Sequence, residues 1–383
     1  MISKLFVDNY KCLVNFELPL QELSLLFGPS GVGKTSVLDI VYALRQLLSG
    51  DARVTDRDIF PTQTLTRWQS RNLQVFEIEV ILGSETYTYR LEVEHERGKR
   101  TARIRSERLE VDGNPLFEFV MSEVQLFRDE PNRGISKGPS YTADWRESAL
   151  ARVFPGPANK RLTRFLDYMC RILVCGIHPP GLLSDSTEES SMLWRDGRNF
   201  ADWYRHTHQE RPDLTEALRK ELVDVVAAGF HLIQLEKVGH DARSLTIRFD
   251  DQEGGDSREG YALRLDEISD GQRALIVLYS LITLGIEKNY TLFVDEPENY
   301  VALREVQPWL IRLNDATGKA FPQAVVSSHH PELIDYFGYG HGIMLQRETS
   351  GVITVGRPQA TRGAGEDPVG LKLSELVARG WER

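Results

Sequence analysis

The chain has 383 residues, of which 41% are hydrophobic and 27% are charged, a globular composition that excludes collagenous, disordered and disulfide-scaffold proteins. Lysine and arginine total 46 against 56 aspartate and glutamate residues, and the net charge of −10 argues against coating of DNA by the whole surface. No apolar run is long enough for a membrane helix, the N-terminus lacks a signal-peptide core, and the three cysteines lack zinc spacing, so we expect a soluble cytoplasmic protein with free thiols.

The first 71 residues contain the first chemical motif. Short apolar segments over residues 5–9, 13–18 and 23–27 predict three strands. Apolar residues at helical spacing from Val37 to Leu48, followed by Gly50, predict a helix. The segment GPSGVGKTS lies between the third strand and this helix, in the context where GxxxxGK[ST] binds nucleotide phosphates.

This P-loop predicts an ATP or GTP site, and residues 1–71 are expected to form the N-terminal part of the ATP-binding lobe. Its glycines allow backbone N–H groups to face the phosphates, and the helix N-terminus adds favourable partial charge. Lys34 is expected to contact the β and γ phosphates, and Thr35 to offer its hydroxyl to Mg²⁺. The predicted nucleotide-binding residues are Gly28, Pro29, Ser30, Gly31, Val32, Gly33, Lys34, Thr35 and Ser36.

Residues 72–130 are predicted to form a β-rich insert packed on the same lobe. Apolar and polar residues alternate over 75–82 and 87–93 around Gly83, which predicts a hairpin, and further strands are expected at 102–111 and 117–126. The composition of 129–145 and 184–191 predicts loops.

The segment Arg97–Arg108 (RGKRTARIRSER) is basic and lies on a predicted hairpin. Its arginines could contact DNA phosphates. The alternative, which we favour, is a solvated face that balances Glu92, Glu94 and Glu96.

Residues 131–260 are expected to form a helical lobe with loops. Helical spacing over 161–173, 199–208 and 212–226 predicts three helices, and 231–249 predicts a smaller β segment. We find no internal repeat and no heptad run, so a long coiled coil is not expected.

Residues 261–383 are expected to form the C-terminal part of the ATP-binding core, and a helix is predicted to start near the beginning of this range. Ser269 precedes apolar residues at helical spacing and is a good N-cap candidate. A serine and a glycine at a helix N-terminus also suit an anion. Ser269, Gly271 and Gln272 are therefore candidate nucleotide-binding residues, with simple helix capping as the alternative.

Two strand ends further along carry the remaining candidates. The apolar strand at 291–295 ends in Asp295 and Glu296, which suits Mg²⁺ binding by the first carboxylate and general-base or water-orienting action by the second. A second apolar strand ends near His329, which is positioned to sense a γ-phosphate. We therefore expect Lys34, Glu296 and His329 to be catalytic, and Thr35 and Asp295 to bind the metal.

The ordered segments GPSGVGKT, ISDGQ, TLFVDEPEN and SSHHPELID resemble those of ABC-type ATPase heads, in particular the RecF, structural-maintenance-of-chromosomes and OLD-like ATPases. The opening NYKC is similar to the strand before the P-loop in that group. The resemblance implies an α/β fold: a P-loop NTPase with an ABC-type two-lobed head, an inserted β meander and a helical lobe. The sequence departs from this pattern at Asp270, where many relatives carry glycine, and at His330, where the OLD-like group often has serine.

The resemblance also implies a homodimer, or a larger assembly built from dimers, with ATP and Mg²⁺ in a head-to-tail joint. One protomer would supply Ser269 and Gly271, and its partner would supply Lys34, Thr35, Asp295, Glu296 and His329.

Several relatives fit less well. A transporter subunit has a shorter chain between Thr35 and Ser269 and a glutamine loop, for which Gln63, Gln69 and Gln125 are weak candidates. A chromosome-structure protein needs a heptad array, and the chain after His329 is too short for the Toprim domain of OLD-type nucleases. Asp56-Arg57-Asp58 is interpreted as an acidic loop rather than a metal site.

The resemblance therefore implies an ATPase that acts as a sensor or switch in antiviral defence, with a nuclease-like effector supplied in trans and no membrane partner. The alternative is a RecF-like DNA-repair clamp that binds DNA through Arg97–Arg108.

Overall fold

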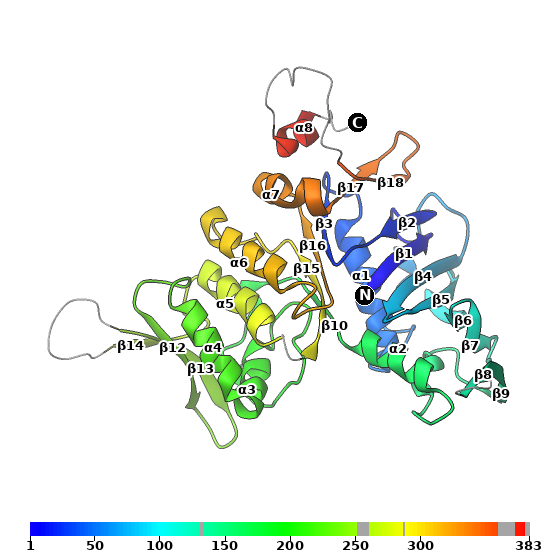
Figure 1. Cartoon of the computed structure of the whole chain (residues 1–383), viewed down its shortest axis with the longest axis horizontal. Coiled ribbons are helices and arrows are strands. Elements are labelled where there is room, and N and C mark those ends of the chain that lie inside the picture. Colours follow the sequence, from blue (N-terminus) through cyan, green and yellow to red (C-terminus); the bar gives the residue numbers. More distant parts are fainter. Residues whose placement is uncertain (131–133, 251–259, 286–287, 359–371, 380–383) are drawn as a thin grey trace. The chain divides into compact units, whose positions relative to one another are not determined.

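A computed structural model describes residues 1–130, 134–250, 260–285, 288–358 and 372–379. The chain divides into two compact units, Met1–Ile172 with Leu333–Arg383, and Leu173–Glu332 (Figure 1). The described residues contain several β-sheets and eight α-helices, which confirms the mixed α/β class. None of the described helices combines the length and hydrophobicity that a bilayer span requires.

The first unit contains a large antiparallel sheet with strand order β2-β1-β4-β5-β6-β7-β8-β9. Apolar and polar residues alternate along its strands, because one face of the sheet is buried. The apolar residues of one strand show this, since they are fully buried: Tyr87, Tyr89, Leu91 and Val93. The strands are β1 (Ile2–Asp8), β2 (Phe16–Pro19), β4 (Leu73–Leu82), β5 (Glu85–Glu96), β6 (Thr101–Val111), β7 (Asn114–Val120), β8 (Glu123–Glu130) and β9 (Gly134–Thr142).

Two predictions for this sheet were wrong. The loop predicted over 129–145 is largely strand among its described residues, because β8 continues to Glu130 and β9 covers Gly134–Thr142 and pairs with it. β9 tolerates Pro139 because it is the edge strand. The segment 117–126 is not one strand but the hairpin β7–β8. It turns at Met121 and Ser122, which adopt positive φ angles of 48° and 76° without the glycine or asparagine that usually marks such a turn.

The P-loop lies in a second layer of the first unit. β3 (Leu23–Phe27) is fully buried and leads to α1 (Lys34–Leu48), whose apolar face is buried as the spacing predicted. β17 (Gly342–Arg347) pairs parallel with β3, and β18 (Ile353–Gly356) pairs antiparallel with β17. The other helices here are α2 (Lys160–Cys170), most of α7 (Pro331–His341) and α8 (Leu373–Arg379).

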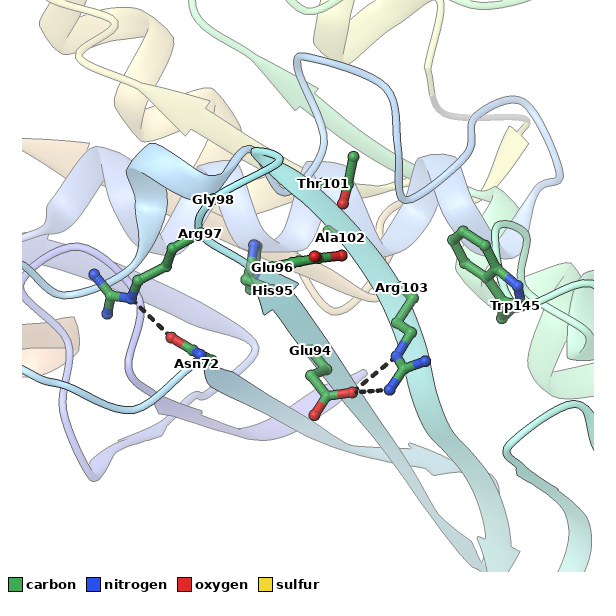
Figure 2. Close-up of a pocket in the computed structure, with 10 residues that line it drawn as sticks. All are labelled: Asn72, Glu94, His95, Glu96, Arg97, Gly98, Thr101, Ala102, Arg103 and Trp145. Carbon is green, nitrogen blue, oxygen red and sulfur yellow. Dashed lines mark hydrogen bonds and ion pairs between the residues drawn. The ribbon is translucent and has the colours of Figure 1, made fainter.

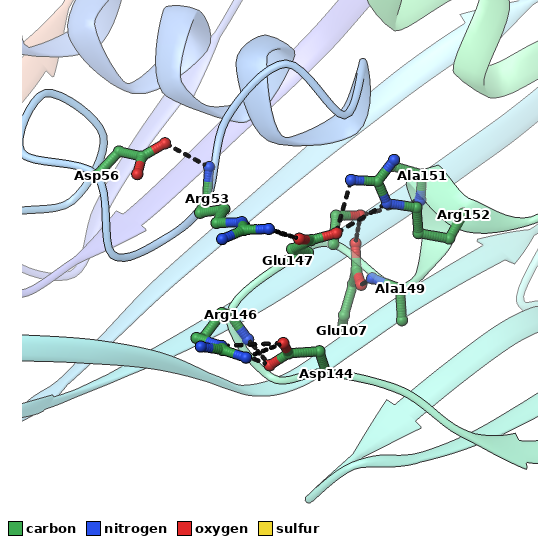
Figure 3. Close-up of polar contacts among 10 residues, drawn as sticks. Arg53, Asp56, Glu107, Asp144, Arg146, Glu147, Ala149, Ala151 and Arg152 are labelled. Carbon is green, nitrogen blue, oxygen red and sulfur yellow. Dashed lines mark hydrogen bonds and ion pairs between the residues drawn. The ribbon is translucent and has the colours of Figure 1, made fainter.

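A buried carboxylate attaches the segment after β9 to the large sheet. Glu107 of β6 is fully buried and accepts hydrogen bonds from the hydroxyls of Tyr89 (2.8 Å) and Ser148 (2.5 Å). It also accepts from the backbone N–H groups of Ala149 (3.0 Å; Figure 3) and Leu150 (3.3 Å). Burial raises the pKa of Glu107, although these four donors oppose the shift.

The second unit contains the strands that carry the acidic motif. β15 (Thr291–Asp295) pairs parallel with β16 (Gln323–Ser328), with Asp295 opposite Ser327, and β10 (Ile172–Cys175) is next to β15. A smaller antiparallel sheet has β13 (Arg243–Phe249) paired with β11 (Asp185–Ser186), β12 (Phe230–Lys237) and β14 (Tyr261–Arg264).

Four helices complete this unit: α3 (Phe200–Glu210), α4 (Pro212–Leu222), α5 (Asp270–Thr283) and α6 (Leu303–Ala316). The last three pack in succession, and α4 also contacts β12 (Figure 1). The helices predicted at 199–208 and 212–226 are confirmed as α3 and a shorter α4, and the loop predicted over 184–191 contains the short β11. The helix predicted over 161–173 ends earlier, at Cys170, because the apolar run from Ile172 forms the fully buried β10.

The cysteines are all free, as predicted. Burial raises the pKa of the Cys175 thiol to about 12, which makes this thiol a poor nucleophile at neutral pH.

Candidate functional site

The P-loop has the backbone geometry that its glycines predict. Gly28 follows β3 with a φ of 141°, and a Cβ there would lie 2.2 Å from the backbone oxygen of Leu345. Gly33 has a φ of 98° immediately before α1, and a Cβ there would lie 3.0 Å from the Cys12 sulfur. Side chains at either position would force the loop away from its neighbours, so glycine is required in both places.

Lys34 is held inside this loop. Its side chain is buried, and its ammonium group donates hydrogen bonds to the carbonyl oxygens of Gly28 (2.8 Å) and Pro29 (3.2 Å). Gly33 supplies no side-chain cap to α1, and the first turn contains no acidic residue. The positive end of this helix is therefore available to an anion, and Lys34 adds a cation beside it.

One loop contact was not predicted. Arg347 on β17 donates a hydrogen bond from Nη2 to the carbonyl oxygen of Gly31 (2.6 Å). Nothing in the sequence signals this contact, because the two residues meet only through the pairing of β3 with β17.

The second unit brings the predicted acidic residues to one strand end. Asp295 is the last residue of β15, and the Ser327 hydroxyl donates a hydrogen bond to its Oδ1. Glu296 follows with a φ of 46°, and its N–H bonds to the carbonyl oxygen of Ser327 (3.0 Å). A non-glycine residue in this left-handed conformation costs on the order of 1–3 kcal/mol, a strain that is typical of functional sites.

Glu296 and His329 lie together, although 32 residues separate them in the chain. The Nδ1 atom of His329 is 3.2 Å from Oε1 of Glu296, and Asn299 donates to Oε2 of the same carboxylate (3.0 Å). The structure therefore places Glu296 and His329, the two residues of this unit that are predicted to be catalytic, within hydrogen-bonding distance of each other. It also adds Glu298, a buried carboxylate at the same strand ends that the sequence did not single out.

Ser269 and Gln272 form a capping box at the start of α5. The N–H of Gln272 donates to the Ser269 hydroxyl (3.3 Å), and the N–H of Ser269 donates to Oε1 of Gln272 (3.1 Å). Gly271 is required by packing, since a Cβ there would lie 2.9 Å from the carbonyl oxygen of Tyr300. Helix capping and packing therefore explain why Ser269, Gly271 and Gln272 occupy these positions. Contact of these residues with a nucleotide stays a prediction.

The predicted Mg²⁺ ligands have suitable chemistry. Thr35 carries an exposed hydroxyl in the first turn of α1, and Asp295 carries a carboxylate at a strand end. Magnesium needs only one or two protein oxygens when substrate phosphates supply others, so the hydroxyl and the carboxylate are each a suitable ligand by type, and their binding of one ion stays a prediction. Within the described ranges no group of three or more acidic, histidine or cysteine side chains is placed to hold a metal.

Three of the six basic side chains of the segment Arg97–Arg108 pair with carboxylates of the same unit: Lys99, Arg103 and Arg108. Figure 2 shows that Arg103 bonds to Glu94 (2.8 Å) and that Arg97 bonds to Asn72 (2.8 Å). Lys99 pairs with Glu96 (2.9 Å). Contact of this segment with DNA stays a prediction.

A hollow of about 560 Å³ lies beside this hairpin, with Trp145 and His95 among its lining residues (Figure 2). Burial lowers the pKa of His95 to about 4, so this ring is neutral at physiological pH, and its Nε2 is 2.8 Å from Oε1 of Gln74.

Residues 180–335 match the model of a P-loop ATPase family described as "AAA domain, putative AbiEii toxin, Type IV TA system". The matched stretch is less than half of the chain. It includes Ser269, Asp295, Glu296 and His329, and it excludes the P-loop at 28–36. No curated protein gives a significant match. The similarity supports an AAA- or ABC-type P-loop ATPase.

Proposed function

We propose that the protein hydrolyses ATP and uses the hydrolysis cycle as a regulatory switch. The observation that carries this proposal is the pairing of Glu296 with His329 at 3.2 Å, directly after Asp295, within the stretch that is similar to a P-loop ATPase family. The P-loop in the other unit supplies the phosphate-binding chemistry that this acidic strand end lacks.

Each residue then has a defined task. Lys34 and the N–H groups at the start of α1 bind the phosphates, and Thr35 with Asp295 would hold Mg²⁺, which neutralises developing charge when bound. Glu296 orients the attacking water and accepts its proton. His329 contacts the γ-phosphate and reports its presence.

We further propose that two copies of the chain share each nucleotide. Support comes from the resemblance to ABC-type heads, in which the segment equivalent to Ser269–Gly271 completes the partner's site. Because the γ-phosphate would then join the two copies, its loss on hydrolysis would release them.

The switch is proposed to control a separate toxic effector, such as a nuclease, in antiviral defence. Support comes from the family description, which names a toxin and a toxin–antitoxin system. A RecF-like DNA clamp is the less favoured proposal, because Arg103 and Lys99 of the basic segment already pair with carboxylates.

The proposal is tested by Lys34→Ala. Removing the ammonium group should weaken Mg-ATP binding by more than about tenfold, because charge-assisted hydrogen bonds to phosphate are each worth roughly 1.5–3 kcal/mol. Binding is measured by calorimetric titration. Lys11→Ala is the matched control, since this lysine lies in the same unit but pairs with Asp39 (2.5 Å). Equal affinity of Lys34→Ala and the wild type would contradict the proposed function.

A further inference from the structure

Glu298 is a buried carboxylate at the centre of the acidic strand end. Its side chain is only 5% exposed, in contrast to that of Glu296, which is 30% exposed. Oε1 accepts hydrogen bonds from the Ser328 hydroxyl (2.5 Å) and from the N–H of His329 (3.4 Å). Oε2 has no hydrogen-bond partner among the described residues. Burial raises the pKa of this carboxyl group.

These contacts determine where His329 projects from β16. Ser328 is the last residue of that strand, so Glu298 bonds to the chain at the point where the strand ends. The Ser328 hydroxyl also accepts from the N–H of His330 (2.9 Å), which fixes the turn that follows. A change at Glu298 therefore acts directly on the backbone that carries the imidazole.

One edge of the His329 imidazole faces two carboxylates, and about half of the side chain is exposed to solvent. Its Nδ1 is 3.2 Å from Oε1 of Glu296 and 3.9 Å from Oε1 of Glu298, while the side chain is 53% exposed. Because Nδ1 faces these two carboxylates, Nε2 at the opposite edge of the ring is the atom that can reach a ligand.

We propose that Glu298 is a positioning residue that holds His329 with Nε2 directed at the γ-phosphate. The inference rests on the proposed function. A role limited to holding β15 and β16 together does not require a buried carboxylate, since backbone pairing and the Ser327–Asp295 bond already join them. A buried carboxyl with a free oxygen is costly, and an apolar side chain would pack there at lower cost.

The test is a double-mutant cycle on single-turnover hydrolysis. Glu298→Ala should slow hydrolysis by about 10²-fold, the lower end of the range for loss of a positioned catalytic group, while the Kd for ATP changes by less than about threefold. Glu298→Gln keeps an acceptor for Ser328 and His329, so it should restore most of the rate.

The cycle also requires the His329→Ala variant and the double variant with Glu298→Ala. If Glu298 acts through His329, Glu298→Ala should add less than about threefold to the defect of His329→Ala. Fully additive losses, or a wild-type rate in Glu298→Ala, would overturn the inference. Should Glu298→Ala fail to fold in a thermal-unfolding check, the same cycle is measured with Glu298→Gln, whose smaller defect must likewise disappear in the His329→Ala background.

Glu305→Gln is the matched control, because this glutamate caps the start of α6 through the N–H of Ala302 (3.2 Å) in the same unit. It should hydrolyse ATP at the wild-type rate, and a defect as large as that of Glu298→Ala would overturn the inference. A wild-type protein that does not hydrolyse ATP contradicts the proposed function and this inference together. A hydrolysing wild type with additive losses contradicts only the role of Glu298.

Discussion

Glu107 shows how one side chain can join distant stretches of the chain. Its four donors come from β5 and from the segment 148–150, so the carboxylate attaches that segment to the sheet. Glu107→Ala would leave two buried N–H groups and two hydroxyls without this acceptor. We expect it to lower the free energy of unfolding by about 3 kcal/mol or more, since each unsatisfied buried group costs roughly 1–3 kcal/mol.

Glu107→Gln should cost less than about 1 kcal/mol, because the amide oxygen can accept from the two N–H groups while the amide nitrogen donates to the hydroxyls. Urea unfolding of both variants measures the difference. A loss in Glu107→Gln as large as that in Glu107→Ala would show that the charge, and not the hydrogen bonding, is required.

The pH dependence of the same variant has a defined sign. Burial raises the pKa of Glu107 above its ordinary value of 4.5, so the folded state binds this proton more tightly than the unfolded state. The stability that this group contributes is present below pH 4.5 and is lost as the pH rises through the folded pKa. Glutamine cannot lose a proton, so Glu107→Gln should gain stability relative to the wild type as the pH is raised from 4.5. Parallel pH profiles would contradict this assignment.

At the scale of elements, the start of α5 can be tested apart from any nucleotide. The capping box of Ser269 and Gln272 predicts that Ser269→Ala lowers the free energy of unfolding by about 1 kcal/mol, whereas Ser269→Thr retains the hydroxyl and loses little. Thermal unfolding of the two variants measures this. Equal stability of Ser269→Ala and the wild type would mean that the cap is not formed in solution.

Elements with local signals could be predicted from the sequence. The β3–loop–α1 unit was found because its glycines, its lysine and its helical spacing are adjacent in the chain, and β4–β5 because both strands alternate around Gly83. The β8–β9 pair was missed, since its glycine and proline content resembles a loop and only pairing at the sheet edge makes it a strand.

The same distinction applies to the candidate site. Asp295, Glu296 and His329 were identifiable because each ends or follows an apolar strand. Glu298 and Arg347 were not, because their roles depend on contacts with Ser328 and Gly31 that exist only after the strands have paired.

At the scale of the whole molecule, the two candidate groups belong to different compact units, the P-loop to the first and the acidic strand end to the second. The P-loop offers the chemistry that binds phosphate, and the acidic strand end offers a metal ligand and a base. The central claim is that both act on one ATP and that Glu296 is the base.

The most direct test of this claim is single-turnover hydrolysis of Mg-ATP by Glu296→Gln, with the amount of bound ATP measured in the same samples. The amide retains the shape of the side chain but cannot accept the proton, so hydrolysis should be about 10²- to 10⁴-fold slower than in the wild type while ATP stays bound. If two copies share the γ-phosphate, the variant should also have the mass of a dimer, or of an assembly of dimers, by light scattering in Mg-ATP and not without it. Hydrolysis by Glu296→Gln at the wild-type rate would contradict the account and remove the catalytic role from this residue.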